Sequence, residues 1–209
     1  MKVYLIFVRQ VILLKKYIHL FVAAVILAGM LLSLPFFDSC EALTEDVLRV
    51  HILANSDSAA DQSLKLSVRD RVLSQCSSYF DDCADKDTAI AVTKAHLSEI
   101  EAVASDEIAR HGFSYPVHAQ IGKTRFDTRY YEDFTMPAGM YDALRLTIGE
   151  GEGKNWWCVM YPSLCVGAAS KTEMRDKLDD GEYEVVTSDR FDLRFKIVEY
   201  WEDIRGWFR

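Results

Sequence analysis

His51 and the polar residues that follow it are the first candidates for chemistry in this chain. An imidazole base at His51 could act with the hydroxyl of Ser56 or the carboxylate of Asp57. The sequence has no HExxH pair for a metal ion and no GxSxG nucleophile motif. A structural role for His51 in a strand and its turn is therefore favoured, and we expect no catalytic residue and no metal site.

The glycine-rich segment 149–153 could in principle hold a phosphate with its backbone amides. A P-loop would require a glycine where Ile148 stands and a hydroxyl side chain where Asn155 stands. The two glutamates of the segment would also repel a phosphate. The segment therefore predicts a turn, and we expect no cofactor.

The sequence between Val47 and Leu73 predicts a strand, a turn and a helix, which would position these residues. Residues 47–53 form an apolar run rich in β-formers, and Asn55-Ser56-Asp57 is typical of a turn. Ser58 and Asp61 resemble a capping box, with Asp in place of the usual Glu or Gln. A helix is expected from there, because apolar residues recur at helical spacing at Leu64, Val68 and Val72.

The next segments predict a long helix and then several strands. Apolar spacing over 85–111 indicates one helix that ends at Gly112, and alternation at Val117, Ala119 and Ile121 indicates a half-buried strand. Residues 144–148 and 156–161 flank the glycine segment and predict a hairpin. An edge strand is expected at 183–187.

The C-terminal residues predict a short strand followed by a helix. Phe191, Leu193 and Phe195 continue an alternation, whereas Ile197, Trp201, Ile204 and Phe208 follow helical spacing. This aromatic helix could dock a partner, but packing onto the protein's own sheet is the commoner outcome and is favoured.

These elements predict an α+β fold: a mainly antiparallel sheet with helices packed on one face, preceded by one N-terminal hydrophobic helix. No linker or internal repeat divides residues 43–209, which fit a single domain.

The N-terminal segment, residues 1–42, predicts export across a membrane. Four basic residues precede 21 uncharged positions, 17–37, which is enough for a bilayer crossing of ~20 residues with the basic end in the cytoplasm. Length favours a retained anchor. Pro35, which is expected to break the helix, and small residues before a possible cleavage after Ala42 favour a cleaved signal. Both alternatives stay open.

The exported part is strongly acidic. After Phe37 there are 20 basic and 32 acidic residues, a net charge of −12. Nucleic acid is excluded as a partner, because its phosphates would repel such a surface at long range.

The cysteines permit one disulfide. An exported location allows a bridge between Cys158 and Cys165, which flank a Tyr-Pro bend. Cys76 and Cys83 have the same spacing, but on one continuous helix their Cα atoms would be about 10.5 Å apart, too far to bridge. They could pair only if the helix ended near Asp81. No CxxC spacing supports a four-cysteine zinc site.

Two blocks of sequence resemble the stage II sporulation protein R family. The first is HILANSDS followed by DQSLKLSVRD, within 51–70, and the second contains PAG, GEG and NWWC, within 137–158. The resemblance implies a protein exported from the forespore into the space between the two septal membranes. There it would activate, by contact, a membrane-embedded aspartic protease that processes a pro-sigma factor.

The resemblance also suggests where contact would occur. Exposed or turn residues of the two blocks are the candidate partner-binding residues: His51, Asn55, Ser56, Asp57, Glu150, Asn155 and Trp156. The alternative is a secreted or anchored hydrolase of the cell envelope that uses His51, Asp57 or the cysteines.

Overall fold

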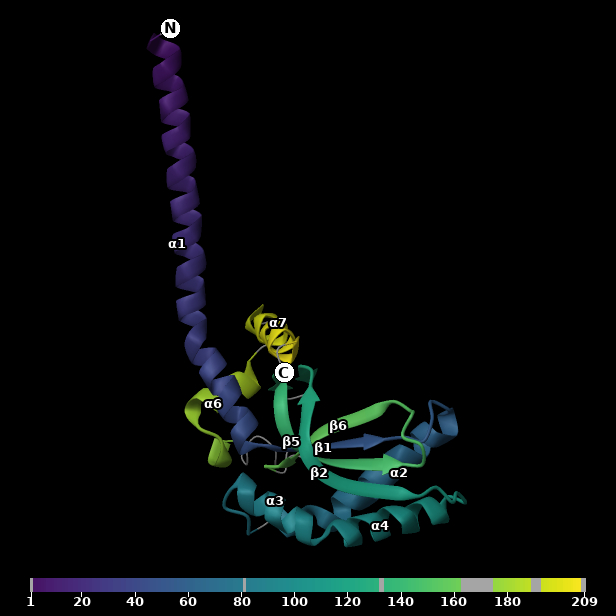
Figure 1. Ribbon diagram of the computed structural model, residues 1–209. Coiled ribbons are helices and arrows are strands. Elements are labelled where there is room, and N and C mark those ends of the chain that lie inside the picture. Colours follow the sequence, from purple (N-terminus) through teal and green to yellow (C-terminus); the bar gives the residue numbers. More distant parts are fainter. Residues whose placement is uncertain (1, 81, 132–133, 163–174, 189–192, 208–209) are drawn as a thin grey trace. The chain divides into compact units, whose positions relative to one another are not determined.

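The structure is a computed structural model that describes residues 2–80, 82–131, 134–162, 175–188 and 193–207 (Figure 1). It consists of two compact units, Met1–Asp38 and Ser39–Arg209. Helix α1 (Lys2–Asp46) forms the first unit as far as Asp38, and its last turns belong to the second unit. By length and composition, Leu13–Asp46 could cross a membrane. The expectation that Pro35 breaks this helix is wrong, since α1 continues through Pro35 to Asp46.

The second unit is built on a four-stranded sheet in the order β2-β5-β1-β6. Its strands are β1 (Leu48–Leu53), β2 (Val117–Phe126), β5 (Gly139–Ile148) and β6 (Asn155–Tyr161). The β1–β5 pairing is parallel, and the β2–β5 and β1–β6 pairings are antiparallel. The predicted α+β class with a mainly antiparallel sheet is therefore confirmed. A separate ribbon pairs β3 (Arg129–Tyr130) with β4 (Thr135–Met136).

The predicted hairpin between residues 144–148 and 156–161 is wrong. Strands β5 and β6 do not pair, because β1 lies between them. All six residues of β1 are buried, which suits a central strand. The segment between β5 and β6 therefore passes over the end of β1 and does not form a tight turn.

Three helices and a short 3-10 helix cover one face of the sheet: α2 (Ala59–Cys76), η1 (Ser77–Phe80), α3 (Lys86–Ala95) and α4 (Leu97–Arg110) (Figure 1). The single helix expected over 85–111 is in fact two helices that meet at His96. The His96 ring stacks on Tyr79 and bonds Glu99, which holds the break in place. Gly112 ends α4 as predicted, with φ of 79°.

The main hydrophobic core lies between this helical layer and the sheet. Leu48, Val50 and Ile52 of β1 point into it. Opposite them lie apolar residues of α2 and α4, which include Leu64, Val68, Val72, Ile100, Ala104 and Ile108. The apolar residues that recur every second position in β1 and every 3.6 positions in α2 therefore pack in one core.

The C-terminal part of the chain is more helical than predicted. The edge strand expected at 183–187 is wrong: this segment forms α6 (Asp180–Thr187), which begins with a capping box between Asp179 and Glu182. The alternation expected through Leu193 and Phe195 is also wrong, because α7 (Leu193–Trp207) begins at Leu193. Phe191 and Phe208 lie outside the described residues.

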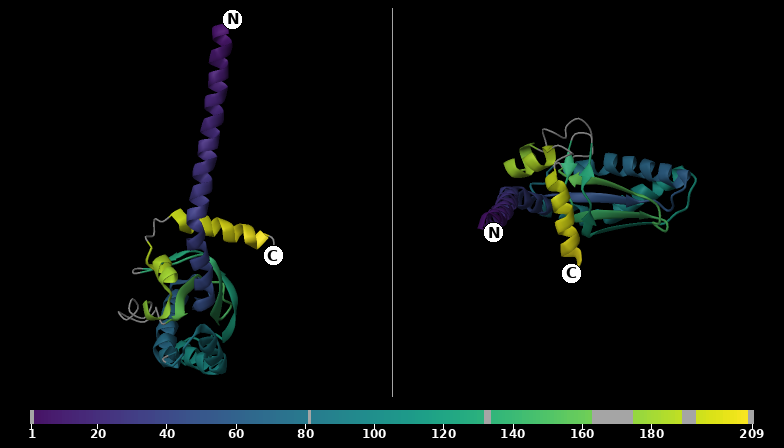
Figure 2. Two further views of the ribbon diagram at one scale, coloured as in Figure 1. Left: turned by 90° about the vertical axis from the view of Figure 1, so that its left-hand side faces the viewer. Right: turned by 90° about the horizontal axis from the view of Figure 1, so that it is seen from above.

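The expected packing of the aromatic stripe of α7 onto the sheet is wrong as well. Ile197, Trp201 and Ile204 are exposed, and the buried residues of this helix are Phe195 and Val198. Helix α7 lies away from the α2–α4 layer (Figure 2).

Candidate functional site

The turn between β1 and α2 is built by short polar side chains. Ser58 Oγ accepts a hydrogen bond from the backbone N–H of Asp61 (3.1 Å), as in the predicted capping box. The other half of the box is replaced, because the N–H of Ser58 donates to Ser56 Oγ (3.1 Å). Asp61 instead accepts from Ser56 Oγ (2.5 Å) and Asn55 Nδ2 (2.9 Å). These bonds, first that from Ser56, lower the pKa of Asp61 below its usual value.

The glycine segment after β5 is seated on this turn. The N–H of Glu150 donates to Asn55 Oδ1 (3.1 Å), and the N–H of Gly153 donates to Ala54 O (2.9 Å). The N–H of Lys154 donates to the carboxylate of Asp57 (2.7 Å). We call residues 54–58 and 149–154 together the turn–loop edge.

Glycine is required in this edge by close approach as well as by backbone conformation. Gly149 and Gly151 have φ of 58° and 66°, a region that L-residues rarely adopt. A Cβ at Gly153 would lie 2.6 Å from the carbonyl carbon of Ser56 and 2.9 Å from Cβ of Ala54. The glycines therefore let one backbone lie directly against another.

Lys65 of α2 binds the turn–loop edge to the helix that follows the turn. Its side chain is 4% exposed, and Nζ donates to Lys154 O (2.8 Å) and to Gln62 Oε1 (2.7 Å). Burial lowers the pKa of this ammonium. The side chains of Asn55, Ser56 and Asp57 are thus engaged in hydrogen bonds that build the edge. Asp57, Glu150, Glu152 and Lys154 stay exposed.

Of the candidate binding residues, Asn55, Ser56, Asp57 and Glu150 come together in the turn–loop edge. Asn155 and Trp156 follow directly at the start of β6 and are half-buried. The Trp156 ring lies 5.1 Å from the guanidinium carbon of Arg69 and packs against the core.

His51 does not join this edge. It is 4% exposed and packs on the face of the sheet that is opposite the helical layer. Its ring centroid lies 4.6 Å from that of Trp157 and 6.1 Å from that of Phe126. Within the described part of the chain, neither ring nitrogen has a hydrogen-bond partner. Burial, with smaller contributions from Arg145 and Arg49, lowers its pKa to about 4. The imidazole is neutral near pH 7, and the contacts described for it do not include Ser56 or Asp57.

A buried arginine next to His51 was not singled out from the sequence. Arg49 is fully buried, and its guanidinium carbon lies 3.9 Å from the ring centroid of Phe126 and 5.0 Å from that of Tyr141. Its Nη2 donates to Tyr131 Oη (2.8 Å). The available signal was a charged residue inside the apolar run LRVHIL. The aromatic rings that enclose the guanidinium offset part of the cost of burying its charge.

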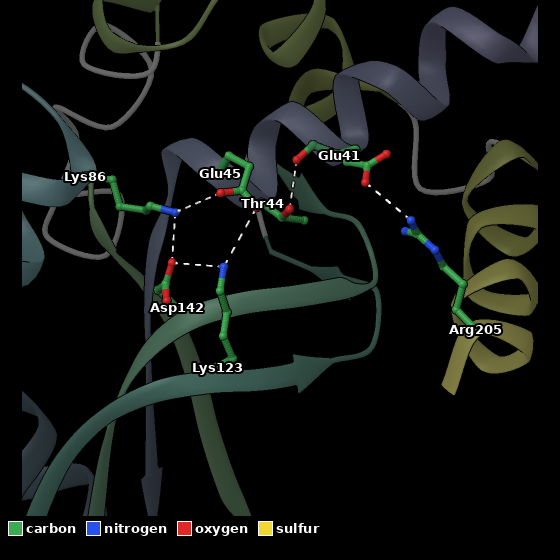
Figure 3. A network of polar contacts seen from close by, with 7 residues as sticks. All are labelled: Glu41, Thr44, Glu45, Lys86, Lys123, Asp142 and Arg205. Carbon is green, nitrogen blue, oxygen red and sulfur yellow. Dashed lines mark hydrogen bonds and ion pairs between the residues drawn. The ribbon is translucent and has the colours of Figure 1, made fainter. Parts of the chain in front are cut away.

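The start of the sheet is tied to α1 by a network of ion pairs (Figure 3). Lys86 Nζ lies 2.8 Å from Asp142 Oδ2 and 3.6 Å from Glu45 Oε2, and Lys123 Nζ lies 3.2 Å from the same Asp142 oxygen. Burial acts to raise the pKa of Asp142, but the bonds from the two lysines outweigh it and lower the value. Lys86 is 7% exposed, so the network is protected from solvent on that side.

The last turns of α1 are an integral part of the second unit. Cys40 and Leu43 are buried in it, and Glu41 pairs with Arg205 of α7 at 3.4 Å (Figure 3). The possible cleavage point after Ala42 therefore lies within a packed helix.

The cysteines divide into two groups. Cys158 belongs to a disulfide, but its predicted partner Cys165 lies outside the described residues, so the pairing stays a prediction. Cys40, Cys76 and Cys83 carry thiols. Burial raises the pKa of Cys76 to about 11, which leaves it protonated and unreactive. Among the described residues, no group of three or more acids, histidines and cysteines could hold a metal ion.

Comparison with known proteins gives two matches. Residues 44–171 match the family model described as Stage II sporulation protein R. The Stage II sporulation protein R of Bacillus subtilis (strain 168) is 35% identical over 140 residues, which cover 67% of this chain and 62% of the relative. No solved structure matches. The range matched by the family model contains the whole turn–loop edge.

Proposed function

The chain belongs to the stage II sporulation protein R family and so has a role in sporulation, and from this premise we propose that it is a signalling protein that activates a membrane-embedded protease by contact. The protease is expected to be the aspartic protease that processes a pro-sigma factor. Activation would shift its conformational or oligomeric equilibrium through differential binding.

The observation that carries this proposal is that the polar side chains of the β1–α2 turn are used in hydrogen bonds that build the turn–loop edge. Asn55, Ser56 and Asp61 are occupied by hydrogen bonds that build the turn, and His51 lies on the other face of the sheet. An enzyme would need a base and a nucleophile aimed at a shared reacting atom. A rigid surface without such groups suits recognition instead.

The proposed contact surface is the outer side of the turn–loop edge. Asp57, Glu150 and Glu152 are exposed acids, and the two glutamates form no ion pair with another described residue. The backbone N–H groups of both glutamates donate to Asn55, that of Glu150 to Oδ1 (3.1 Å) and that of Glu152 to the carbonyl oxygen (3.2 Å), so little ordering is needed on binding. A basic surface on the protease is the expected complement.

We also propose that α1 crosses the forespore membrane and stays attached, which places the second unit in the space between the septal membranes. Support comes from the burial of Cys40 and Leu43 in the second unit and from the ion pair of Glu41 with Arg205. Cleavage after Ala42 would remove two of these three residues from a packed structure.

The test is reconstitution of the purified full chain with membranes that hold the protease and its pro-protein substrate. We expect processing only when the chain is added. The double substitution Glu150→Lys with Glu152→Lys should reduce it at least tenfold. A matched control, Asp82→Lys with Asp87→Lys, makes the same charge change at exposed positions outside the edge and should leave processing unchanged.

Two outcomes would remove the proposal. One is processing that is unaltered by the chain. The other is turnover of an envelope substrate by the chain alone, which would favour the hydrolase alternative.

A further inference from the structure

Helix α7 carries a continuous apolar stripe that the fold leaves uncovered. Starting from Leu193, the exposed large side chains recur at positions 4, 7, 8, 11 and 14 further along the helix. At about 100° per residue, this spacing places all of them within one third of the helix circumference. The stripe consists of Leu193, Ile197, Tyr200, Trp201, Ile204 and Trp207.

The opposite side of α7 attaches the helix to the second unit. Phe195 and Val198 are buried there, and the Phe195 ring packs edge-on against Tyr130. Asp203 forms an ion pair with Arg125 of β2. These contacts fix the rotation of the helix, so the stripe faces outward because of packing and not because of fraying.

An ion pair links α7 to the last turns of α1, a few residues along the chain from the proposed membrane segment. Arg205 pairs with Glu41 at 3.4 Å (Figure 3). Glu41 is four residues after Phe37, the end of the uncharged run. Four residues span at most about 14 Å even when fully extended, which is close to the diameter of one helix. If α1 crosses the bilayer, Arg205 in the last turn of α7 is therefore held within a short distance of the point where the chain leaves the lipid.

We propose that α7 lies in the interface of the bilayer that α1 crosses, with its apolar stripe buried among the lipids. Trp and Tyr favour this region because their rings combine an apolar body with a polar group. The helix has three basic residues (Arg194, Lys196 and Arg205) and three acidic ones (Glu199, Glu202 and Asp203), so zwitterionic lipid suffices. The inference goes beyond the proposed function, since it concerns lipid and requires no protease.

The test uses the full chain in phosphatidylcholine vesicles whose acyl chains carry bromine near the headgroup. Bromine quenches tryptophan fluorescence only at close range, and the chain has four tryptophans. We expect brominated vesicles to quench about half of the emission of the unmodified chain. In the variant Trp201→Phe with Trp207→Phe, that quenching should fall at least fivefold.

The control is Trp156→Phe, which removes a tryptophan of β6 and should keep the quenching. Both substituted residues of α7 are exposed, so an unchanged circular dichroism melting curve is expected for the double variant. Equal quenching before and after the double substitution would overturn the proposal. The proposal would also be overturned if the chain were dimeric and the fluorescence of Trp201 and Trp207 were not quenched, since a second copy would then cover the stripe.

Discussion

The contact between the glycine segment and the β1–α2 turn can be tested with a single methyl group. The perturbation is Gly153→Ala. The new Cβ would meet the Ser56 carbonyl carbon at 2.6 Å and the Ala54 Cβ at 2.9 Å, and both belong to a turn fixed by several hydrogen bonds. The segment must therefore move away from the turn.

The expected cost follows from the bonds that this movement breaks. The N–H of Gly153 would lose Ala54 O (2.9 Å), and the N–H of Lys154 would lose the Asp57 carboxylate (2.7 Å). A neutral hydrogen bond contributes about 1 kcal/mol and one to a charged group about 2 kcal/mol. Alanine lowers the entropy of the unfolded chain, which returns roughly 0.5–1 kcal/mol. The net loss in the free energy of unfolding is about 2 kcal/mol.

The assays are urea unfolding and thermal unfolding of the full chain in mild detergent, both followed by circular dichroism. A matched control is Gly122→Ala in β2, where a Cβ meets nothing within 4 Å. We expect this control to be neutral or slightly stabilising. The melting temperature of Gly153→Ala should fall by roughly 4–8 °C. Equal stability of the two variants would refute the contact and, with it, the turn–loop edge as one rigid surface.

Three further predictions concern buried groups. His51 has a pKa of about 4 in the folded chain, below its ordinary 6.5, so between these pH values the unfolded chain binds one proton more than the folded chain. The contribution of His51 to the free energy of unfolding is therefore complete above pH 6.5 and falls by up to about 3 kcal/mol as the pH drops to 4. In unfolding titrations His51→Leu should remove this pH dependence and the exposed His118→Leu should keep it; equal curves contradict the assignment. Leu64→Ala should cost about 2–5 kcal/mol and the exposed Leu66→Ala of the same helix under 1 kcal/mol, unless the helix faces the other way. Thiol titration of the denatured, unreduced chain should return three groups and not five, and the native chain should react slowly at all of them: Cys40, Cys76 and Cys83.

The parts of the fold that the sequence predicts well are those decided by local interactions. The β1–turn–α2 unit depends on a short apolar run, on Asn55 to Ser58 and on a helical period, all within a few residues of one another. Gly112 similarly ends α4 by its own conformational freedom. The capping box of Asp179 and Glu182 was an equally local signal, and it outweighs the β-propensity of the residues that follow.

The errors in strand order and in side-chain contacts concern pairing between distant segments. Alternating apolar residues in β5 and β6 suit a hairpin, and nothing local to them shows that β1 separates the two strands. The meeting of Asn55 with Glu150 depends on this same crossing over β1, so the candidate residues could be named from the sequence but their contact could not. Arg49 was missed because its stabilising partners, Phe126 and Tyr141, are far away in the chain.

Signalling by contact through the turn–loop edge is tested most directly by photo-crosslinking in sporulating cells. A photoreactive amino acid is placed at position 150 or, as the control, at position 87, both of which are exposed. The account predicts a covalent adduct with a membrane-embedded protease from position 150 and none from position 87. An adduct with that protease from neither position, or adducts from position 150 with wall material alone, would contradict it.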